Sequence, residues 1–323
     1  MFESFIKQHS QAAWWRALET LAPGIHEVDR NATEIWFHFF PLALAEAVAE
    51  TASLPETVQR LRLAGNYRIA EQIDTSHWFL YGHRYWPRVK AAIIQRAQSG
   101  AAASSLELPA VIREIAGRQG DDASLMLGIT AVGLMTLQQV GLEAFRSGGD
   151  GTSTGTDGRQ YLQGTPAQIL AVRRKNDSQG LAGLWRGIRS HFTVTFDERR
   201  RDGRFTVINQ QHLTTGSAND TRTYASGPRT CIEGPIPVEC RTASCGTCWV
   251  GVLGGAERLS DVEPHEAKRM KEFGYISTPE PKPLIRLACA AVASGNATIV
   301  IPPWNGFIGA RTGSRETSAA RQE

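Results

Sequence analysis

The sequence predicts an α+β protein with an all-α helical domain at its N-terminus and a strand-containing domain at its C-terminus. Three observations predict this class. Apolar residues recur at helical spacing in the first half, a polar Gly- and Thr-rich stretch follows, and short alternating segments fill most of the rest. The expected ranges are 1–147 for the helical domain, 148–191 for a linker, 192–308 for the second domain and 309–323 for a disordered tail.

The helical domain is predicted from the spacing of its apolar side chains. Trp14, Trp15 and Leu18 would share one face of a helix, and Pro41 suits the first turn of another. Alternating strand patterns are scarce in this half. Further helices are expected over 55–73, 86–99, 106–118 and 123–146.

The most apolar stretch, 125–145, is about long enough to span a bilayer. Polar side chains at Gln138, Gln139 and Glu143 favour a buried core helix over a membrane span, so no transmembrane segment is expected. The first residues show no signal-peptide pattern, so export by that route is not expected and a cytoplasmic location is predicted.

The linker is dominated by Gly, Thr, Ser and Asp, a composition that buries little apolar surface. It ends in a short basic segment, 181–189, whose apolar residues fall at i, i+3, i+4 and i+7 beside two arginines. This segment could lie on an anionic membrane surface, on a partner complex, or along the chain's own two domains.

The second domain is expected to contain strands at 192–196, 204–208, 248–253 and 297–301. The polar stretch between the first two ends in Asp-Gly, which is typical of a hairpin turn.

All five cysteines lie in the last third of the chain, and their odd number argues against a secreted disulfide framework. Cys240, Cys245 and Cys248 form a C-x4-C-x2-C run, and Cys289 follows far downstream. This spacing is that of a [2Fe–2S] cluster held by four thiolates. Small residues in the loop would let backbone N–H groups point at sulfur and favour the reduced state. The fifth, Cys231, is expected to be a small buried thiol rather than a spare ligand.

Structural zinc is the alternative, because four thiolates can also form a tetrahedral site. Zinc sites usually show two paired C-x2-C knuckles, whereas this chain has one such pair. Cys240 has no place in the zinc pattern, so the cysteines favour the iron–sulfur cluster.

On these motifs, residues 192 to about 303 resemble the β-grasp domain of plant-type [2Fe–2S] ferredoxins. The matching pieces are Ile-Pro-Val-Glu-Cys at 236–240, Cys-Gly-Thr-Cys at 245–248, the strand that follows, and Arg-Leu-Ala-Cys at 286–289. The resemblance implies a β-grasp fold, one [2Fe–2S] cluster and one-electron transfer. It implies that the ligands are Cys240, Cys245, Cys248 and Cys289, and it supplies no catalytic residue.

The chain departs from the family pattern at two places. Ala243 stands where the family commonly has glycine, which should either restrict the backbone of the loop or alter one N–H···S contact. In addition, 40 residues separate Cys248 from Cys289, which is more than in typical plant proteins. The extra length should hold a helix after residue 259, with Ser260 or Asp261 as its cap.

The helical half holds one unexplained cluster of histidines and aromatic residues around Asp74, His77 and His83. A di-iron bundle would show Glu-x-x-His twice with two further glutamates, and this pattern is at best half met. The favoured interpretation is a buried network in which Asp74, His77 and Arg84 satisfy one another. A docking surface for a redox partner is a further alternative.

The functional expectation is therefore an electron carrier without a catalytic residue, serving a redox donor and acceptor as a ferredoxin-like subunit or carrier. Its partners should not include nucleic acid, because the formal charge is only +3. Two alternatives stay open: a redox enzyme whose helical domain holds a second cofactor, and an interaction protein with a structural or sensing cluster.

Overall fold

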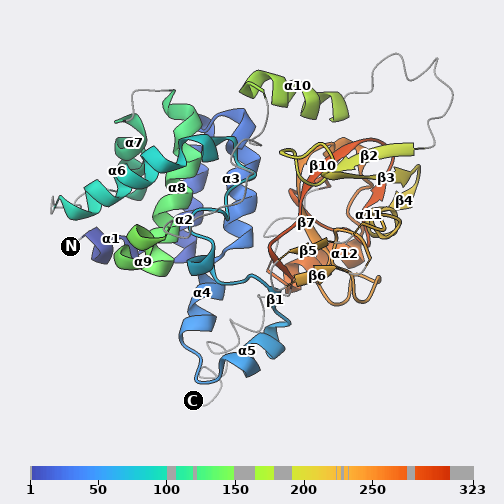
Figure 1. The fold of residues 1–323 in the computed structure, drawn as a ribbon, viewed down its shortest axis with the longest axis horizontal. Coiled ribbons are helices and arrows are strands. Elements are labelled where there is room, and N and C mark those ends of the chain that lie inside the picture. The colour runs from blue at the N-terminus through green and yellow to red at the C-terminus, as the bar shows by residue number, and fades with distance from the viewer. Residues whose placement is uncertain are drawn as a thin grey trace. The chain divides into compact units, whose positions relative to one another are not determined.

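A computed structural model describes residues 2–99, 107–118, 122–148, 164–177, 191–222, 224–226, 229–231, 233–274 and 281–305. The chain divides into two compact units (Figure 1). The N-terminal unit contains residues 1–45 and 68–166, and the C-terminal unit contains 46–67 and 167–323. The first is helical and the second carries a mixed sheet, which gives an α+β protein. Residues 46–67 belong to the C-terminal unit although they fall within the range expected for the helical domain.

Helix α8, Ala123–Val140, is the centre of the N-terminal unit and packs against α3, α6 and α7. Gly133 of α8 lets α6 pack closely against α8, because a Cβ at this position would lie 2.6 Å from the Cδ1 atom of Ile93 in α6. The other elements are α1 Phe2–Lys7, α2 Gln11–Leu21, η1 Ala22–Gly24, α3 Glu27–Phe39, α4 Leu42–Ala49, η2 Ile69–Glu71, η3 Tyr81–Tyr85, α6 Trp86–Gln98, α7 Leu108–Gly117 and α9 Leu142–Ser147.

By length and composition α8 is apolar enough to cross a membrane, but 67% of it is buried inside the fold. It is the one such helix among the described residues, and its burial agrees with the expected core helix. The helix expected over 123–146 is broken at Gly141, whose φ of 79° ends α8 and starts α9. The helix expected over 55–73 also ends early, because α5, Leu54–Leu61, is capped by Arg62 with φ 51°.

The sheet of the C-terminal unit has five strands in the order β3-β2-β10-β7-β8. Strand β2 runs parallel to β10, and the other neighbours are antiparallel. The strands expected from alternation correspond to β2, β3, β7 and β10 within a few residues. Their bounds are β2 His191–Thr195, β3 Arg204–Ile208, β7 Trp249–Gly254, β8 Ile285–Leu287 and β10 Ala297–Val300.

Shorter elements surround this sheet in Figure 1. The helices are α10 Pro166–Asp177, α11 Leu213–Ala218, η5 Ala256–Arg258 and α12 Pro264–Glu272. The two-stranded pairs are β4 Gln211–His212 with β9 Val292–Ala293, β5 Tyr224–Ser226 with β6 Arg229–Cys231, and β1 Ala64–Gly65 with β11 Trp304–Asn305.

The pairing of β1 with β11 joins the early segment 46–67 to the sheet unit. Ala64 pairs with Asn305, and the N–H of Asn66 donates to the carbonyl of Pro303 at 3.1 Å. Beside this pairing, the Trp304 ring packs edge-on against that of Trp249, with centroids 5.5 Å apart, and both rings are buried. The early segment therefore completes one edge of the C-terminal unit.

Strand register fixes which loops share an end of the sheet. Thr298 of β10 pairs with Thr195 of β2 in parallel and with Gly254 of β7 in antiparallel orientation. The end of β2 is therefore level with the end of β7, and β10 runs on to Val300, which pairs with Gly251. The turn between β2 and β3 follows Thr195 and so starts level with Gly254.

Candidate functional site

Four cysteines with free thiols come together at the start of β7 and after the end of β8. Cys245, Cys248 and Cys289 are buried, whereas Cys240 is half-exposed. Their side chains form two hydrogen-bonded pairs, Cys240 with Cys245 and Cys248 with Cys289. The structure thus brings together the four residues expected from the spacing. The side chain of Cys231, the fifth cysteine, lies outside the described part of the chain.

The loop that carries the first three cysteines has an unusual backbone. Arg241, Ala243 and Gly246 have φ values of 57°, 56° and 72°, in the left-handed region. These turns aim successive N–H groups inward. Thr242 and Ser244 donate to Cys240 Sγ at 3.4 and 3.2 Å, and Ala243 donates to Cys289 Sγ at 3.2 Å. The last bond ties the loop to the distant fourth cysteine.

The loop also shifts the acidity of its thiols. Burial raises the pKa of Cys240, but hydrogen bonds from the Thr242 N–H and the Cys245 thiol outweigh it and bring that pKa down to about 7. The thiol of Cys248 lowers the pKa of Cys289 by donating a hydrogen bond to its sulfur, and the same bond raises the pKa of Cys248. Each pair therefore contains one thiol that ionises readily, as metal binding by thiolate requires.

The arrangement of the thiols fits a binuclear centre better than a single metal ion. Within the described ranges, no group of three or more His, Cys, Asp or Glu side chains is placed to hold one metal ion. Tetrahedral zinc needs all four sulfurs around one point. Two pairs of thiols, with N–H groups directed at sulfur, suit two irons with two thiolates each.

A buried ion pair holds the segment that leads to Cys289. Arg286 of β8 donates to both carboxylate oxygens of Glu266 in α12, each at 2.9 Å, and each side chain is only 1% exposed. The same carboxylate accepts the N–H of Leu287 at 3.0 Å. On the other side, Ala288 donates its N–H to the carbonyl of Cys248 at 3.0 Å. Helix α12 thereby fixes the backbone just before the fourth cysteine.

The expected extra helix is present as α12, but its predicted cap is wrong. Pro264 opens the helix and Glu263 is its N-cap residue, three residues after Ser260. The hydroxyl of Ser260 accepts from the Val292 N–H at 3.2 Å instead, and Asp261 pairs with Lys282 at 2.9 Å. Both side chains are therefore engaged by residues outside α12.

Replacing Ala243 with glycine should stabilise the loop. A left-handed φ costs a non-glycine residue about 1–2 kcal/mol, and the greater freedom of glycine in the unfolded chain offsets part of this gain. We expect Ala243→Gly to raise the free energy of unfolding of the C-terminal unit by about 0.5–1 kcal/mol, measured by urea denaturation. Ala291→Gly, a buried control position without positive φ, should lower it. If Ala243→Gly and Ala291→Gly changed the free energy of unfolding equally, the backbone strain assigned to Ala243 would be wrong.

The histidine cluster of the N-terminal unit forms a network that differs from the expected one. His77 donates from Nε2 to the carbonyl of Ile73 at 3.1 Å, so its Nδ1 accepts from His83 Nδ1 at 2.8 Å. Asp74 does not contact His77 but accepts from Trp86 Nε1 at 2.6 Å and Lys90 Nζ at 2.9 Å. The predicted Asp74–His77–Arg84 network is therefore wrong.

The guanidinium of Arg84 donates to the Tyr81 hydroxyl at 3.0 Å and lies over the ring of that residue. Of the aromatic side chains expected to fill the core here, Trp86 is buried and Trp78 is 37% exposed. Helical spacing alone placed Asp74 and His77 together, but this segment of the chain is a series of turns.

Stability of the N-terminal unit should fall as the pH drops below about 6.5. Burial and the neighbouring His83 hold the pKa of His77 well below its ordinary value. The unfolded chain therefore takes up a proton at His77 over a pH range in which the folded unit does not. Urea unfolding followed by tryptophan fluorescence between about pH 7.5 and 5.5 would measure this slope.

The variant His77→Gln should show a weaker pH dependence than the wild type. His212→Gln, which removes an exposed histidine of the C-terminal unit, should leave the dependence unchanged. A slope in His77→Gln equal to that of the wild type would exclude His77 as its source.

Comparison with known families gives one match, in the C-terminal unit. Residues 207–294 match the family model of the 2Fe-2S iron-sulfur cluster binding domain. The matched range contains all four clustered cysteines and α12, whereas the helical N-terminal unit lies outside it. No curated protein and no solved structure shows significant similarity to the chain. The C-terminal part therefore contains a [2Fe–2S] cluster-binding domain, which is an electron-transfer module.

Proposed function

We propose that this protein transfers single electrons through one [2Fe–2S] cluster, as a ferredoxin-like subunit or carrier of a larger redox system. The ligands in this proposal are Cys240, Cys245, Cys248 and Cys289. The observation that carries it is the pairing of four free thiols inside a matched cluster-binding domain. A bound cluster of this kind accepts and releases one electron without making or breaking substrate bonds.

The residues around the thiols have distinct tasks in this proposal. Cys240 and Cys245 hold one iron, and Cys248 and Cys289 hold the other, following the two hydrogen-bonded pairs. The N–H groups that point at Cys240 and Cys289 stabilise negative charge on sulfur and so favour the reduced state. Burial of three thiols limits access of water, and the half-exposed Cys240 marks the side open to electron exchange.

The remaining parts of the proposal concern fold and partners. We assign the C-terminal domain to the β-grasp fold, which is supported by the parallel pairing of β2 with β10 in a mixed sheet and by α11 following β3 and β4. We assign recognition of the larger system to the N-terminal unit, because residues 192–310 carry 13 Lys plus Arg against 12 Asp plus Glu. That near balance gives no strongly acidic docking face.

Two predictions about location stay predictions. The cytoplasmic location is a prediction from the sequence alone. The basic amphipathic segment 181–189 lies outside the described residues, so its expected association with a membrane or a partner complex rests on sequence alone.

The proposal is tested on the purified full-length chain by iron and acid-labile sulfide analysis with EPR of the dithionite-reduced protein. About two irons per chain and one rhombic signal that returns after reoxidation without loss of iron are expected. About four irons per chain would favour an enzyme with a second centre in the helical unit. Loss of iron on reduction would contradict the carrier and favour a sensing or structural cluster.

A further inference from the structure

Helix α12 brings a histidine to the loop that carries the first three cysteines. The helix occupies the long interval between Cys248 and Cys289, and His265 lies in its first turn. The Nε2 atom of His265 is 3.4 Å from the carbonyl oxygen of Thr242 in the loop. Since a carbonyl oxygen only accepts hydrogen bonds, this nitrogen carries the hydrogen. His265 is therefore a donor to the loop.

The carbonyl that accepts from His265 belongs to a peptide group that also contacts a proposed cluster ligand. The same peptide group carries the N–H of Ala243, which donates to Cys289 Sγ at 3.2 Å. The hydroxyl of Ser244 is a second donor to this carbonyl, at 3.2 Å. Hydrogen bonds in such a chain polarise one another, so a donor at the carbonyl strengthens the N–H donor at the other end. His265 can thereby act on the Cys289 sulfur without contacting it.

The backbone of His265 is held in place by the residue that follows it. Glu266 is buried and accepts hydrogen bonds from the Arg286 guanidinium and from the N–H of Leu287. These bonds tie the first turn of α12 to β8, whereas the His265 side chain is exposed to solvent beside the loop. An imidazole in this position can exchange a proton with water while its backbone stays fixed.

Protonation of His265 keeps this contact and adds a charge to it. The hydrogen on Nε2 stays in the bond to Thr242, and the new proton binds to Nδ1. At 3.4 Å the bond is long for a neutral donor, and a charged donor forms shorter and stronger hydrogen bonds. The imidazolium therefore polarises the peptide group more strongly and brings a positive charge to the loop. Both effects stabilise the more negative, reduced state of the cluster.

The other charged side chains on the loop, on α12 and on the strand behind it belong to types that ordinarily ionise outside the range from about pH 5.5 to 8. They are Arg241 with Glu233, Glu239 with Arg62, Asp261 with Lys282, Glu266 with Arg286 and Arg269 with Glu272 as ion pairs, and Glu263, Lys268 and Lys271. The four cysteines stay deprotonated while they hold iron. Histidine is the side chain that ordinarily changes charge within this range. Among these described residues, pH is therefore expected to act through His265.

We propose that His265 couples reduction of the cluster to the uptake of a proton. This inference rests on the proposed electron-transfer function and describes how pH regulates it. One electron from the redox donor enters the cluster, and one proton from water binds to Nδ1 of His265, so the added charges balance. Such coupling is reciprocal: His265 binds its proton more tightly when the cluster is reduced, and the reduction potential rises as the pH falls. His265 is a positioning residue in this scheme, because it acts through the peptide group between Thr242 and Ala243.

The test measures the midpoint potential of the full-length holoprotein between about pH 5.5 and 8, by redox titration followed with EPR. In the wild type, the equilibrium constant for one-electron reduction should increase about threefold from pH 8 to 5.5, which raises the potential by about 28 mV at 59 mV per tenfold. His265→Gln keeps a neutral donor but cannot take up the proton, so its potential should not depend on pH in this way. A His265→Gln protein with the wild-type pH dependence would overturn the proposal.

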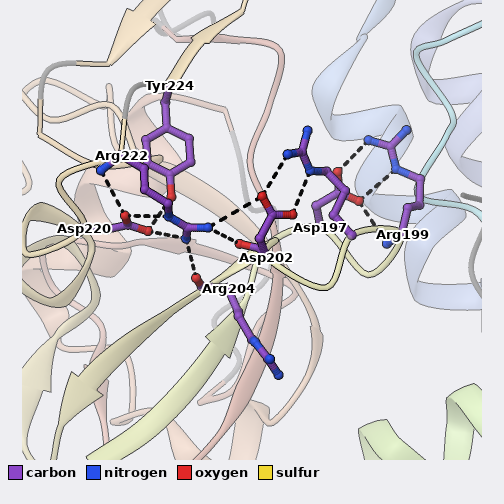
Figure 2. Close-up of polar contacts among 8 residues, drawn as sticks. Asp197, Arg199, Asp202, Arg204, Asp220, Arg222 and Tyr224 are labelled. Carbon is purple, nitrogen blue, oxygen red and sulfur yellow. Dashed lines mark hydrogen bonds and ion pairs between the residues drawn. The ribbon is translucent and has the colours of Figure 1, made fainter. Parts of the chain in front are cut away.

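Two control variants separate this effect from the loss of any charge or of any histidine. Through the paired strands, Arg204 is level with Gly254, six residues along β7 from Cys248. This is about 20 Å at the ordinary rise of a strand, and Figure 2 shows the Arg204 side chain extending away from the network that its own carbonyl joins. Arg204→Gln should therefore keep the wild-type pH dependence, and so should His191→Gln at the start of β2. Loss of the dependence in either control, as in His265→Gln, would rule out a specific role of His265.

Resonance Raman spectra of the oxidised holoprotein give a second measurement that does not depend on electron transfer. The iron–sulfur stretching bands respond to hydrogen bonds at the cysteine sulfurs, so they should shift between about pH 8 and 5.5 in the wild type and stay constant in His265→Gln. Bands that shift alike in both proteins would contradict the proposal. A cluster that is reduced reversibly, with one pH dependence in both proteins, would overturn this inference and leave electron transfer intact. A cluster that dithionite cannot reduce would instead overturn the proposed function, and the coupling with it.

Discussion

Replacing Cys289 with serine is expected to abolish the cluster. Cys289 is the ligand supplied from outside the loop, and it is held at the site by the N–H of Ala243 and by its pairing with Cys248. Without its thiolate one iron would keep a single protein sulfur, so the purified variant should lose nearly all visible absorption, acid-labile sulfide and reduced-state EPR signal.

The matched control is Cys231→Ser, which removes the one cysteine outside the proposed ligand set. This variant should keep wild-type iron, sulfide and EPR signal. A cluster that survives in Cys289→Ser, or one that disappears in Cys231→Ser, would show that the ligand set is wrong.

Replacing Glu266 with glutamine is expected to have the largest effect on stability. The change leaves the Arg286 guanidinium buried without its counter-charge, which typically costs about 3–5 kcal/mol. It also weakens the bond that fixes the Leu287 N–H, two residues before Cys289. The free energy of unfolding of the C-terminal unit should fall by that amount in urea denaturation, and the cluster should be lost earlier in the transition.

An exposed ion pair of the same helix provides the control. Arg269 and Glu272 lie 2.7 Å apart, and both side chains are more than a third exposed. Glu272→Gln should therefore change the free energy of unfolding by less than about 1 kcal/mol. Equal costs for Glu266→Gln and Glu272→Gln would mean that the buried pair contributes no more than a surface pair.

Local patterns in the sequence predicted those features that depend on neighbours along the chain. The three-cysteine loop is one short segment, and the strands at β2, β3, β7 and β10 follow from alternation over a few residues. Ala243 was singled out in the sequence because the related domains commonly have glycine there, and the structure gives it a left-handed φ of 56°. Such features require only that the local chain adopt one of a few allowed conformations.

Features that depend on contacts between distant segments were not predicted. Glu266 and Arg286 are 20 residues apart, so nothing in the local pattern pairs them. Asp74 was assigned to His77 because both fit one helical face, but its partners are on α6, beyond the turns that replace that helix.

The strand pair β1–β11 has a consequence for how the protein can be divided. The backbone passes between the units at residues 45–46, 67–68 and 166–167, so the C-terminal unit is assembled from two stretches of chain. A fragment starting at residue 192 would lack the strand that pairs with β11 and would leave the backbone of Trp304 and Asn305 open to another chain. A single protease cut at residues 166–167 would likewise leave residues 46–67 on the N-terminal fragment, separated from the rest of the C-terminal unit's chain. Fragments for study should therefore retain residues 46–67 together with the cluster-binding domain.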